Sequence, residues 1–305
     1  MAGGAPTCYP GSVAFHLKGR RLRRDLKRLI RKQLDAAIKC LGIKHPREVA
    51  RHNARTHIKK ARAILKMLRD PLERYGKEDG RLRDAGHRLS PLRDAEATTR
   101  AFDSLTRRYK KTLTSSIDRP ISLGLKRQQR GLATSVHTRI GEARALLERS
   151  RKSLPGRVRR AASFHDVRVG IEEAYARSCT AMTGLSTESS DAEFHAWRRR
   201  IKEHWYQVRL FERAGSAVRR RAKRLEKLES ALGDEHDLAR LAQLLTATPK
   251  KFGGVRTTAI AIGCIRKRQV SLRRQALAHG QHLFTAKPKA FAATVKSWHH
   301  ALEEA

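Results

Sequence analysis

The sequence VARHNARTHIKKARAILKML spans Val49–Leu68, and EFHAWRRRIKEHWYQVRLFE spans Glu193–Glu212. Both stretches carry a histidine followed by basic residues at the same steps, and the two histidines, His52 and His195, lie 143 positions apart (195 − 52). Residues spaced by three, four and seven positions share one face of an α-helix, so each stretch predicts a helix with a basic stripe. The first stripe is His52, Arg55, Lys59, Arg62 and Lys66; the second is His195, Arg198, Lys202 and Arg209, with Trp205 in the place of Arg62.

The same interval recurs outside the stripes. Leu89–Asp94, with the sequence LSPLRD, matches Leu232–Asp237, with the sequence LGDEHD, again 143 positions later. An ordered series of matches at one interval indicates an internal duplication, which a chance likeness between two basic helices does not explain. We therefore predict two similar halves, each with a short turn at this second motif.

The hydrophobic pattern predicts an all-α fold, because no segment shows sustained alternation of apolar and polar residues. The simplest architecture is a pair of antiparallel helical bundles related by pseudo-twofold symmetry. We expect a flexible N-terminal tail at residues 1–11 and repeats at 12–154 and 155–305, together making one domain. The predicted helices cover residues 12–41, 46–69, 72–89, 92–117, 123–154, 157–183, 189–213, 216–232 and 235–247, with others after Pro249 and Pro288.

The charge of the chain points to a polyanionic partner. There are 68 Lys and Arg residues against 29 Asp and Glu, a formal net charge of +39 at pH 7. Self-repulsion of this size disfavours a compact state, and a bound polyanion would relieve it. The four cysteines are dispersed without a CxxC motif, and no run of about 18 apolar residues occurs, so we expect no zinc site, no membrane insertion and a cytoplasmic protein.

The first stripe lies beside the apolar face of its predicted helix, so it should line a groove between helices. From His52 to Lys66 it extends about 21 Å along the helix axis, enough for several phosphates. Arginine holds phosphate oxygens with a planar fork and lysine adds a mobile charge, so the mixture suits a flexible phosphate chain. The histidines are predicted to donate hydrogen bonds to phosphate, with tighter binding at mildly acidic pH.

More ordinary interpretations apply to several of these residues. A basic stripe in so basic a chain can be a solvated face, and each stripe histidine can be a structural hydrogen-bonding group. Trp205 and Tyr206 are interpreted as core residues, and Asp94 and Asp237 as helix caps or salt-bridge partners. No metal site is predicted at the remaining C-terminal histidines, which lack the necessary carboxylate pattern: His279, His282, His299 and His300.

The stripes and the second motif, taken in order, resemble the CHAD domain, a conserved-histidine α-helical family. His52-Asn53-Ala54-Arg55 and His195-Ala196-Trp197-Arg198 are similar to the family's histidine motif, and the segments at 89–94 and 232–237 to its Leu-Gly-x-x-Arg-Asp turn. The resemblance implies a pair of four-helix bundles around one basic groove that binds inorganic polyphosphate without catalysis or a cofactor. It also suggests recruitment to polyphosphate granules. Beyond the stripes, further candidate binding residues are Arg20, Arg24, Lys27, Arg31 and Arg199.

The sequence also departs from the family pattern. Thr56 and the pair Lys59-Lys60 replace a valine and two arginines, and Ser90 and His236 replace Gly and Arg in the turns. Glu203 and Trp205 interrupt the second stripe, which predicts that the two halves are unequal and that the second holds phosphate less strongly at its C-terminal end.

Two other functions are weighed against polyphosphate binding. A nucleic-acid-binding protein would share the sequence pI near 11.3, but no known reading motif is present and aromatic residues are only 5%, few for base stacking. An enzyme acting on phosphoanhydrides would need a P-loop or paired carboxylates at metal-ligand spacing, and neither is apparent. We therefore predict a stand-alone, non-catalytic binding module, with nucleic acid as the secondary partner; the sequence does not indicate an oligomeric state.

Overall fold

The computed structural model describes residues 14–19, 21–42, 48–133 and 135–304, and every regular element in these ranges is a helix. This confirms the all-α prediction. The segment 1–11 and Arg20 lie outside the described residues. The first half contains α1 (Leu22–Leu41), α2 (Glu48–Met67), α3 (Tyr75–Arg88), α4 (Ser90–Arg108), α5 (Ser115–Ala133) and α6 (Val136–Ala161). The second contains α7 (Phe164–Met182), α8 (Asp191–Arg209), α9 (Ser216–Ala247), α10 (Gly254–Leu283) and α11 (Pro288–Glu304), with the short 3₁₀ helices η1 (Glu212–Ala214) and η2 (Pro249–Phe252).

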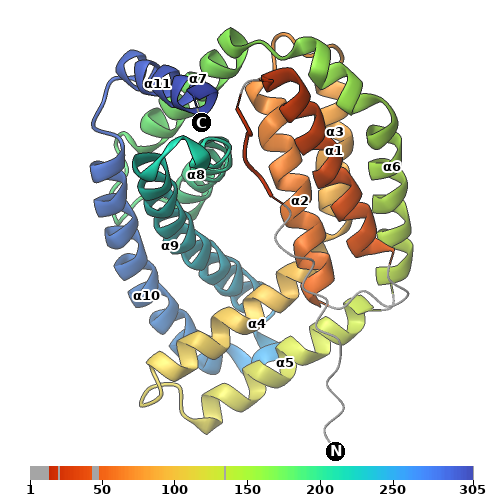
Figure 1. The fold of residues 1–305 in the computed structure, drawn as a ribbon. Helices are drawn as coiled ribbons and strands as arrows, with labels where there is room; N and C mark the ends of the chain where they lie inside the picture. The colour runs from red at the N-terminus through yellow and green to blue at the C-terminus, as the bar shows by residue number, and fades with distance from the viewer. Residues whose placement is uncertain (1–13, 20, 43–47, 134, 305) are drawn as a thin grey trace, which may run out of the picture.

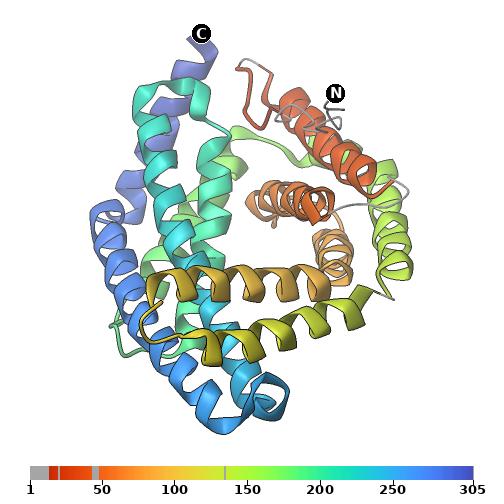
Figure 2. The ribbon, with the colours of Figure 1, turned by 90° about the horizontal axis from the view of Figure 1, so that it is seen from below.

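The helices form two groups joined by a crossing pair. Helices α1, α2, α3 and α6 pack together on one side, and α7 to α11 on the other (Figure 1). From the first group, α4 and α5 run across to pack on α9 and α10, as the view from below shows (Figure 2). The first half therefore reaches over the second, and the molecule is more interlocked than two separate bundles.

The hydrophobic core follows this interlocking. Its larger part contains residues of both halves, such as Leu29 of α1, Ile64 of α2 and Trp197 of α8, none of which exposes any surface. A second part joins Phe102 of α4 to Leu241 of α9 and their neighbours. Neither half buries a core of its own.

The stripe helices keep the interval seen in the sequence, since His52 lies in α2 and His195, 143 positions later, lies in α8. The pseudo-twofold relation of the halves remains a prediction, as do the repeat limits 12–154 and 155–305.

Several predicted boundaries are wrong. The first helix begins at Leu22, well after residue 12, and a break after Arg108 and another at Ser135 replace the predicted helices at 92–117 and 123–154. Helix α6 continues through Pro155, which is buried with Leu154 and Val158, so core packing outweighs the hydrogen bond that proline cannot donate.

The predicted turn at Leu232–Asp237 does not exist, because α9 passes through it without a break. In the first half the chain does break, at Leu89, and Pro91 occupies the first turn of α4. Proline fits the start of a helix and disrupts its interior. The residue that corresponds to Pro91 is Asp234, which lets α9 continue.

Candidate polyanion-binding site

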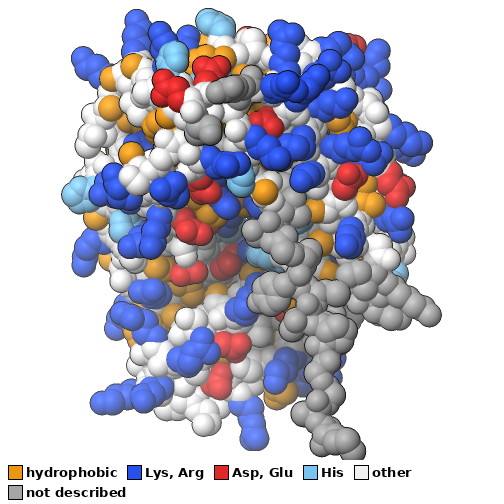
Figure 3. Space-filling view, viewed as in Figure 1, with side chains coloured by type: hydrophobic (Ala, Val, Ile, Leu, Met, Phe, Trp, Pro, Cys, Tyr) orange, Lys and Arg blue, Asp and Glu red, His pale blue; other side chains and the backbone are white. Residues whose placement is uncertain are grey.

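The two stripes lie on helices that meet near the middle of the molecule. The side chain of Gln207 in α8 donates a hydrogen bond to the carbonyl oxygen of Ala63 in α2, at 3.4 Å. The ammonium of Lys66 in α2 donates to Glu203 of α8 at 2.5 Å. The fold therefore brings two stripes 143 residues apart in sequence to one interface, beside the hollow in the face of the molecule seen in Figure 3.

At this interface six cations from four helices act on one another electrostatically. Burial lowers the pKa of several members, and repulsion by the others lowers it further, as expected for charges that share one region. We call this set the inter-helix cluster. It consists of Arg55 and Lys59 of α2, Arg93 of α4, Arg198 and Lys202 of α8, and Arg240 of α9.

Lys59 is the least compensated member of the cluster. Burial lowers the pKa of its ammonium well below the usual value, and repulsion by Lys202 and Arg55, then by Arg198 and Arg93, lowers it further. Among the described residues, no hydrogen bond or ion pair joins Lys59. A desolvated cation close to four other cations attracts an anion strongly.

Arg55 is held in place by neutral groups. Its guanidinium donates hydrogen bonds to the carbonyl oxygen of Gly86, at 2.5 Å, and to the hydroxyl of Ser90. Burial lowers its pKa to about 10, an effect that the nearby Asp94 opposes. Both bonds come from the chain around the α3–α4 break, so the break positions Arg55 and leaves its charge uncompensated by a direct carboxylate contact.

Carboxylates hold the other members of the cluster. Glu229 of α9 accepts from Lys202 and lies 3.4 Å from Arg198. Asp94 of α4 accepts from Arg240 at 2.6 Å and from Arg93 at 3.2 Å, and Arg93 also lies 3.6 Å from Asp237. Three carboxylates thus orient four of the six cations, and the cluster keeps a positive excess.

Asp94 and Asp237 do form salt bridges, but with arginines outside the stripes and not with the stripe residues that the sequence predicted. Arg93 of the first half pairs with Asp237 of the second, and Arg240 of the second pairs with Asp94 of the first. These crossed pairs join α4 to α9. Neither aspartate caps a helix, because α9 continues past Asp237 and α4 begins before Asp94.

The two stripe histidines border the cluster. Burial and then Arg93, Lys59, Lys202 and Arg55 lower the pKa of His52. His195 stacks on His236, with ring centroids 4.2 Å apart, and burial followed by Arg198 lowers its pKa. The Nδ1 atom of His195 is buried without a hydrogen-bond partner in the described residues, which is unusual for a buried polar atom.

The C-terminal ends of both stripes are neutralised. Arg62 forms a two-point ion pair with Asp79 of α3, at 2.8 and 2.9 Å, and Arg209 contacts Glu212 at 3.2 Å. Lys66 pairs with Glu203, which Arg177 also contacts. Glu203, which interrupts the second stripe, therefore neutralises the end of the first one. Trp205 and Tyr206 are buried and stack on each other, which confirms them as core residues.

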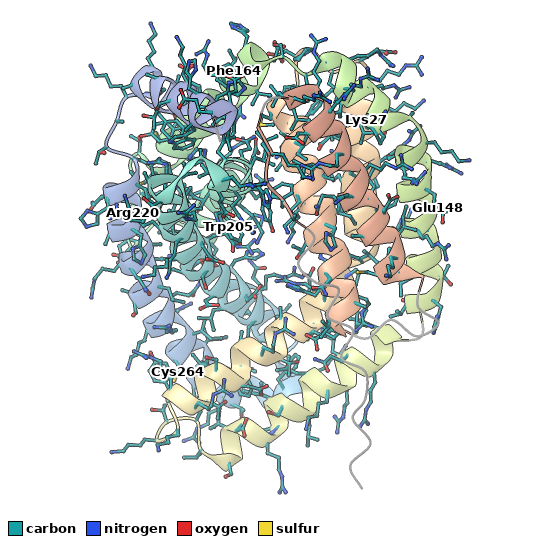
Figure 4. All side chains as sticks on the ribbon, viewed as in Figure 1. Lys27, Glu148, Phe164, Trp205, Arg220 and Cys264 are labelled. Carbon is teal, nitrogen blue, oxygen red and sulfur yellow. The ribbon has the colours of Figure 1, made fainter. Side chains whose placement is uncertain are left out.

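The remaining candidates lie elsewhere. Arg199 is exposed, and it lies close enough to His195 to lower the pKa of that histidine. Arg24, Lys27 and Arg31 line a separate hollow between α1 and α6, where Lys27 is seen in Figure 4. Sequence reasoning assigned no role to Arg93, Arg240 or Glu229. Arg93 stood within the quoted LSPLRD motif, whereas no pattern singled out the other two.

The described part of the chain contains no group of three His, Cys, Asp or Glu side chains arranged to hold a metal ion. No described helix is long and apolar enough to cross a membrane. The chemistry of the site is therefore that of fixed, partly desolvated cations with histidine nitrogen atoms at the edge, which suits an extended, multiply charged anion.

Comparison with known proteins defines the class first. A search for similar solved structures finds PptA from Streptomyces chartreusis, with 16% identity, a TM-score of 0.63, and coverage of 88% of this chain and 100% of the other. It also finds the CHAD domain from the plant Ricinus communis, with 17% identity, a TM-score of 0.56, and coverage of 93% and 94%. At these identities the matches show a shared all-helical fold. No curated protein matches the sequence.

The family follows from the sequence itself. The family model described as the CHAD domain matches residues 20–246, which is most of the chain. The protein belongs to the CHAD domain family, as its stripes and second motif predicted.

Proposed function

We propose that this protein binds inorganic polyphosphate at the inter-helix cluster and catalyses no reaction on it. The observation that carries the proposal is the setting of Lys59, a desolvated ammonium opposite Lys202 and beside three arginines, with no carboxylate of its own. A phosphate chain supplies closely spaced negative charges that a single small anion does not. Membership of the CHAD domain family and the likeness to its solved structures support this choice.

Nucleic acid is the weaker candidate for the same cluster. The aromatic side chains beside the stripes, Trp205 and Tyr206, are buried and stacked on each other, so they offer no platform for bases. A phosphate chain without bases needs no such platform. We therefore expect polyphosphate to be preferred when both are offered at equal phosphate concentration.

Competition binding tests the proposal. Labelled long-chain polyphosphate is bound to the protein, and unlabelled polyphosphate, duplex DNA and single-stranded RNA are added at equal phosphate concentrations. Displacement by polyphosphate alone supports the proposal, and equal displacement by either nucleic acid refutes the preference. Steady release of phosphate from the bound chain in the presence of Mg²⁺ would show that the protein is an enzyme.

The variant Lys59→Met/Lys202→Met identifies the site. Each substitution removes a cluster charge and keeps a flexible, unbranched side chain, and we expect the affinity to fall by roughly tenfold or more per lost charge-assisted contact. The control is Lys223→Met/Lys227→Met, which removes two exposed charges from α9. Equal losses in both double variants would place the binding elsewhere.

In the cell, we propose that the protein is cytoplasmic and associates with polyphosphate granules. A fluorescent fusion should form foci that coincide with granules, disperse in cells that cannot make polyphosphate, and disperse with the Lys59→Met/Lys202→Met variant. Foci that persist without polyphosphate would contradict this part of the proposal.

A further inference from the structure

The outer face of α1 carries a second concentration of positive charge. Between α1 and α6 lies a hollow of about 510 Å³, lined by five cations of α1, by Arg159 of α6 and by a single carboxylate, Asp35. Its lining contains no aromatic and no apolar side chain. Three of the further candidate binding residues from the sequence, Arg24, Lys27 and Arg31, are found here.

This basic surface continues along the helix. A neighbouring hollow of about 700 Å³ shares Arg24 with the first and is also lined by Arg21, the residue before α1, by Arg23 of α1 and by Phe164 of α7. One face of the Phe164 ring is already stacked on His299, at 3.9 Å. From Arg21 to Asp35 the surface extends about 21 Å along α1, the same length as the first stripe.

Most of this charge is not compensated within the protein. Among the described residues, Arg24, Lys27, Lys32 and Arg159 form no ion pair, whereas Arg28 pairs with Asp25 at 3.0 Å. Asp35 is shared between Arg31, at 3.8 Å, and Arg151, at 2.6 Å. Isolated surface charges contribute little one at a time, so this surface favours a ligand with many linked charges.

The outer face of α1 is separated from the inter-helix cluster by core. The opposite face of α1 is mainly apolar, with Leu26, Ile30 and Leu34 exposing no surface, and it packs against α2 and α6. None of the largest causes of the lowered pKa values of Lys59 and Arg55 comes from α1. A phosphate group bound at one surface therefore cannot contact the other.

We infer that the outer face of α1 is a second polyphosphate-binding surface, independent of the inter-helix cluster, so that one protein molecule holds two chain segments at once. The inference rests on the proposed function for the identity of the ligand. Bases would find no free aromatic platform in the hollow between α1 and α6, and a lipid surface would find no apolar side chains there. A flexible phosphate chain requires only the charges.

Binding stoichiometry of a short polyphosphate, long enough to span one helix, tests the inference. We expect the wild-type protein to bind two chains, the cluster variant Lys59→Met/Lys202→Met one, and the α1 variant Arg24→Gln/Lys27→Gln/Arg31→Gln one. Combining both sets of substitutions should abolish saturable binding. With long chains, wild-type molecules that bind two chain segments should be cross-linked into large particles, which light scattering detects. The α1 variant should bind long chains without forming such particles.

A matched control separates site from net charge. Arg220, Lys223 and Lys227 are exposed on α9 at the same spacing as the α1 set, and Arg220 lies far from Lys27 in Figure 4. The variant Arg220→Gln/Lys223→Gln/Lys227→Gln should still bind two short chains and should still form large particles with long chains. If this control and the α1 variant behave alike, or if duplex DNA displaces the chain retained by the cluster variant, the inference is overturned. If the cluster variant instead keeps both chains, the proposed binding at the inter-helix cluster is wrong. The comparison of the α1 variant with its control then still shows whether the outer face of α1 binds polyphosphate.

Discussion

At the scale of the residue, Lys59 links stability to binding. Its charge is desolvated and repelled by Lys202, Arg55, Arg198 and Arg93, so it destabilises the free protein. We expect Lys59→Met to raise the free energy of unfolding by on the order of 1 kcal/mol, because a buried unpaired polar group typically costs this much or more. The same substitution should weaken polyphosphate binding by about tenfold. Urea unfolding and equilibrium binding measure the two effects.

The pH dependence of stability checks the same assignment. The pKa of Lys59 in the folded protein lies below its usual value of 10.5. Protonation is then more favourable in the unfolded chain, so stability should fall as the pH decreases from about 10.5 to the folded pKa and be constant below it. Lys59→Met should reduce this fall relative to the wild type, and Lys227→Met should not. An identical alkaline profile for all three proteins would remove Lys59 as the source.

Histidine protonation should tighten binding in mildly acidic solution. The pKa values of His52 and His195 are lowered below 6.5 in the free protein, and a bound phosphate chain would raise them. Binding should therefore take up protons, and affinity should increase as the pH falls from about 7.5 to about 5.5. His236, with a pKa of about 3, stays neutral throughout. A flat profile for the wild type, or an unchanged slope in His52→Gln/His195→Gln, would exclude the two histidines.

At the scale of the element, alanine substitutions at two glycines are expected to have opposite effects on stability. Gly233 lies inside α9, and an added Cβ would meet only the Arg198 guanidinium, at 3.7 Å, so Gly233→Ala should stabilise the protein by about 0.5–1 kcal/mol. Gly170 of α7 packs against α2 so closely that a Cβ would lie 2.1 Å from the Met67 carbonyl oxygen. Gly170→Ala should cost about 1–3 kcal/mol. Urea unfolding midpoints that shift in the same direction would contradict this packing.

Elements also show how far sequence reasoning extends. Periodicity predicted the helices of both stripes closely, because an amphipathic pattern and tertiary burial agree there. It predicted a turn at Leu232–Asp237 by analogy with Leu89–Asp94, but Pro91 and Asp234 make that analogy fail. The pairing of Lys66 with Glu203 was not predictable, since it depends on how two helices 137 residues apart cross. The same holds for Arg240 and Glu229, whose roles depend on the position of α9.

At the scale of the whole molecule, salt should act on folding and binding in opposite directions. With a net charge of +39, the positive side chains repel one another, and a salt such as sodium chloride screens that repulsion. The melting temperature of the free protein should therefore rise with salt concentration. Polyphosphate affinity should fall over the same range. Protein binding releases the cations condensed on the phosphate chain, and this release is less favourable at a higher salt concentration. In a logarithmic plot of affinity against salt, each cluster cation that contacts phosphate adds about one to the slope. Lys59→Met/Lys202→Met should therefore lower the slope by about two, whereas Lys223→Met/Lys227→Met should leave it unchanged. A binding constant that does not respond to salt would show that fixed charge is not what holds the ligand.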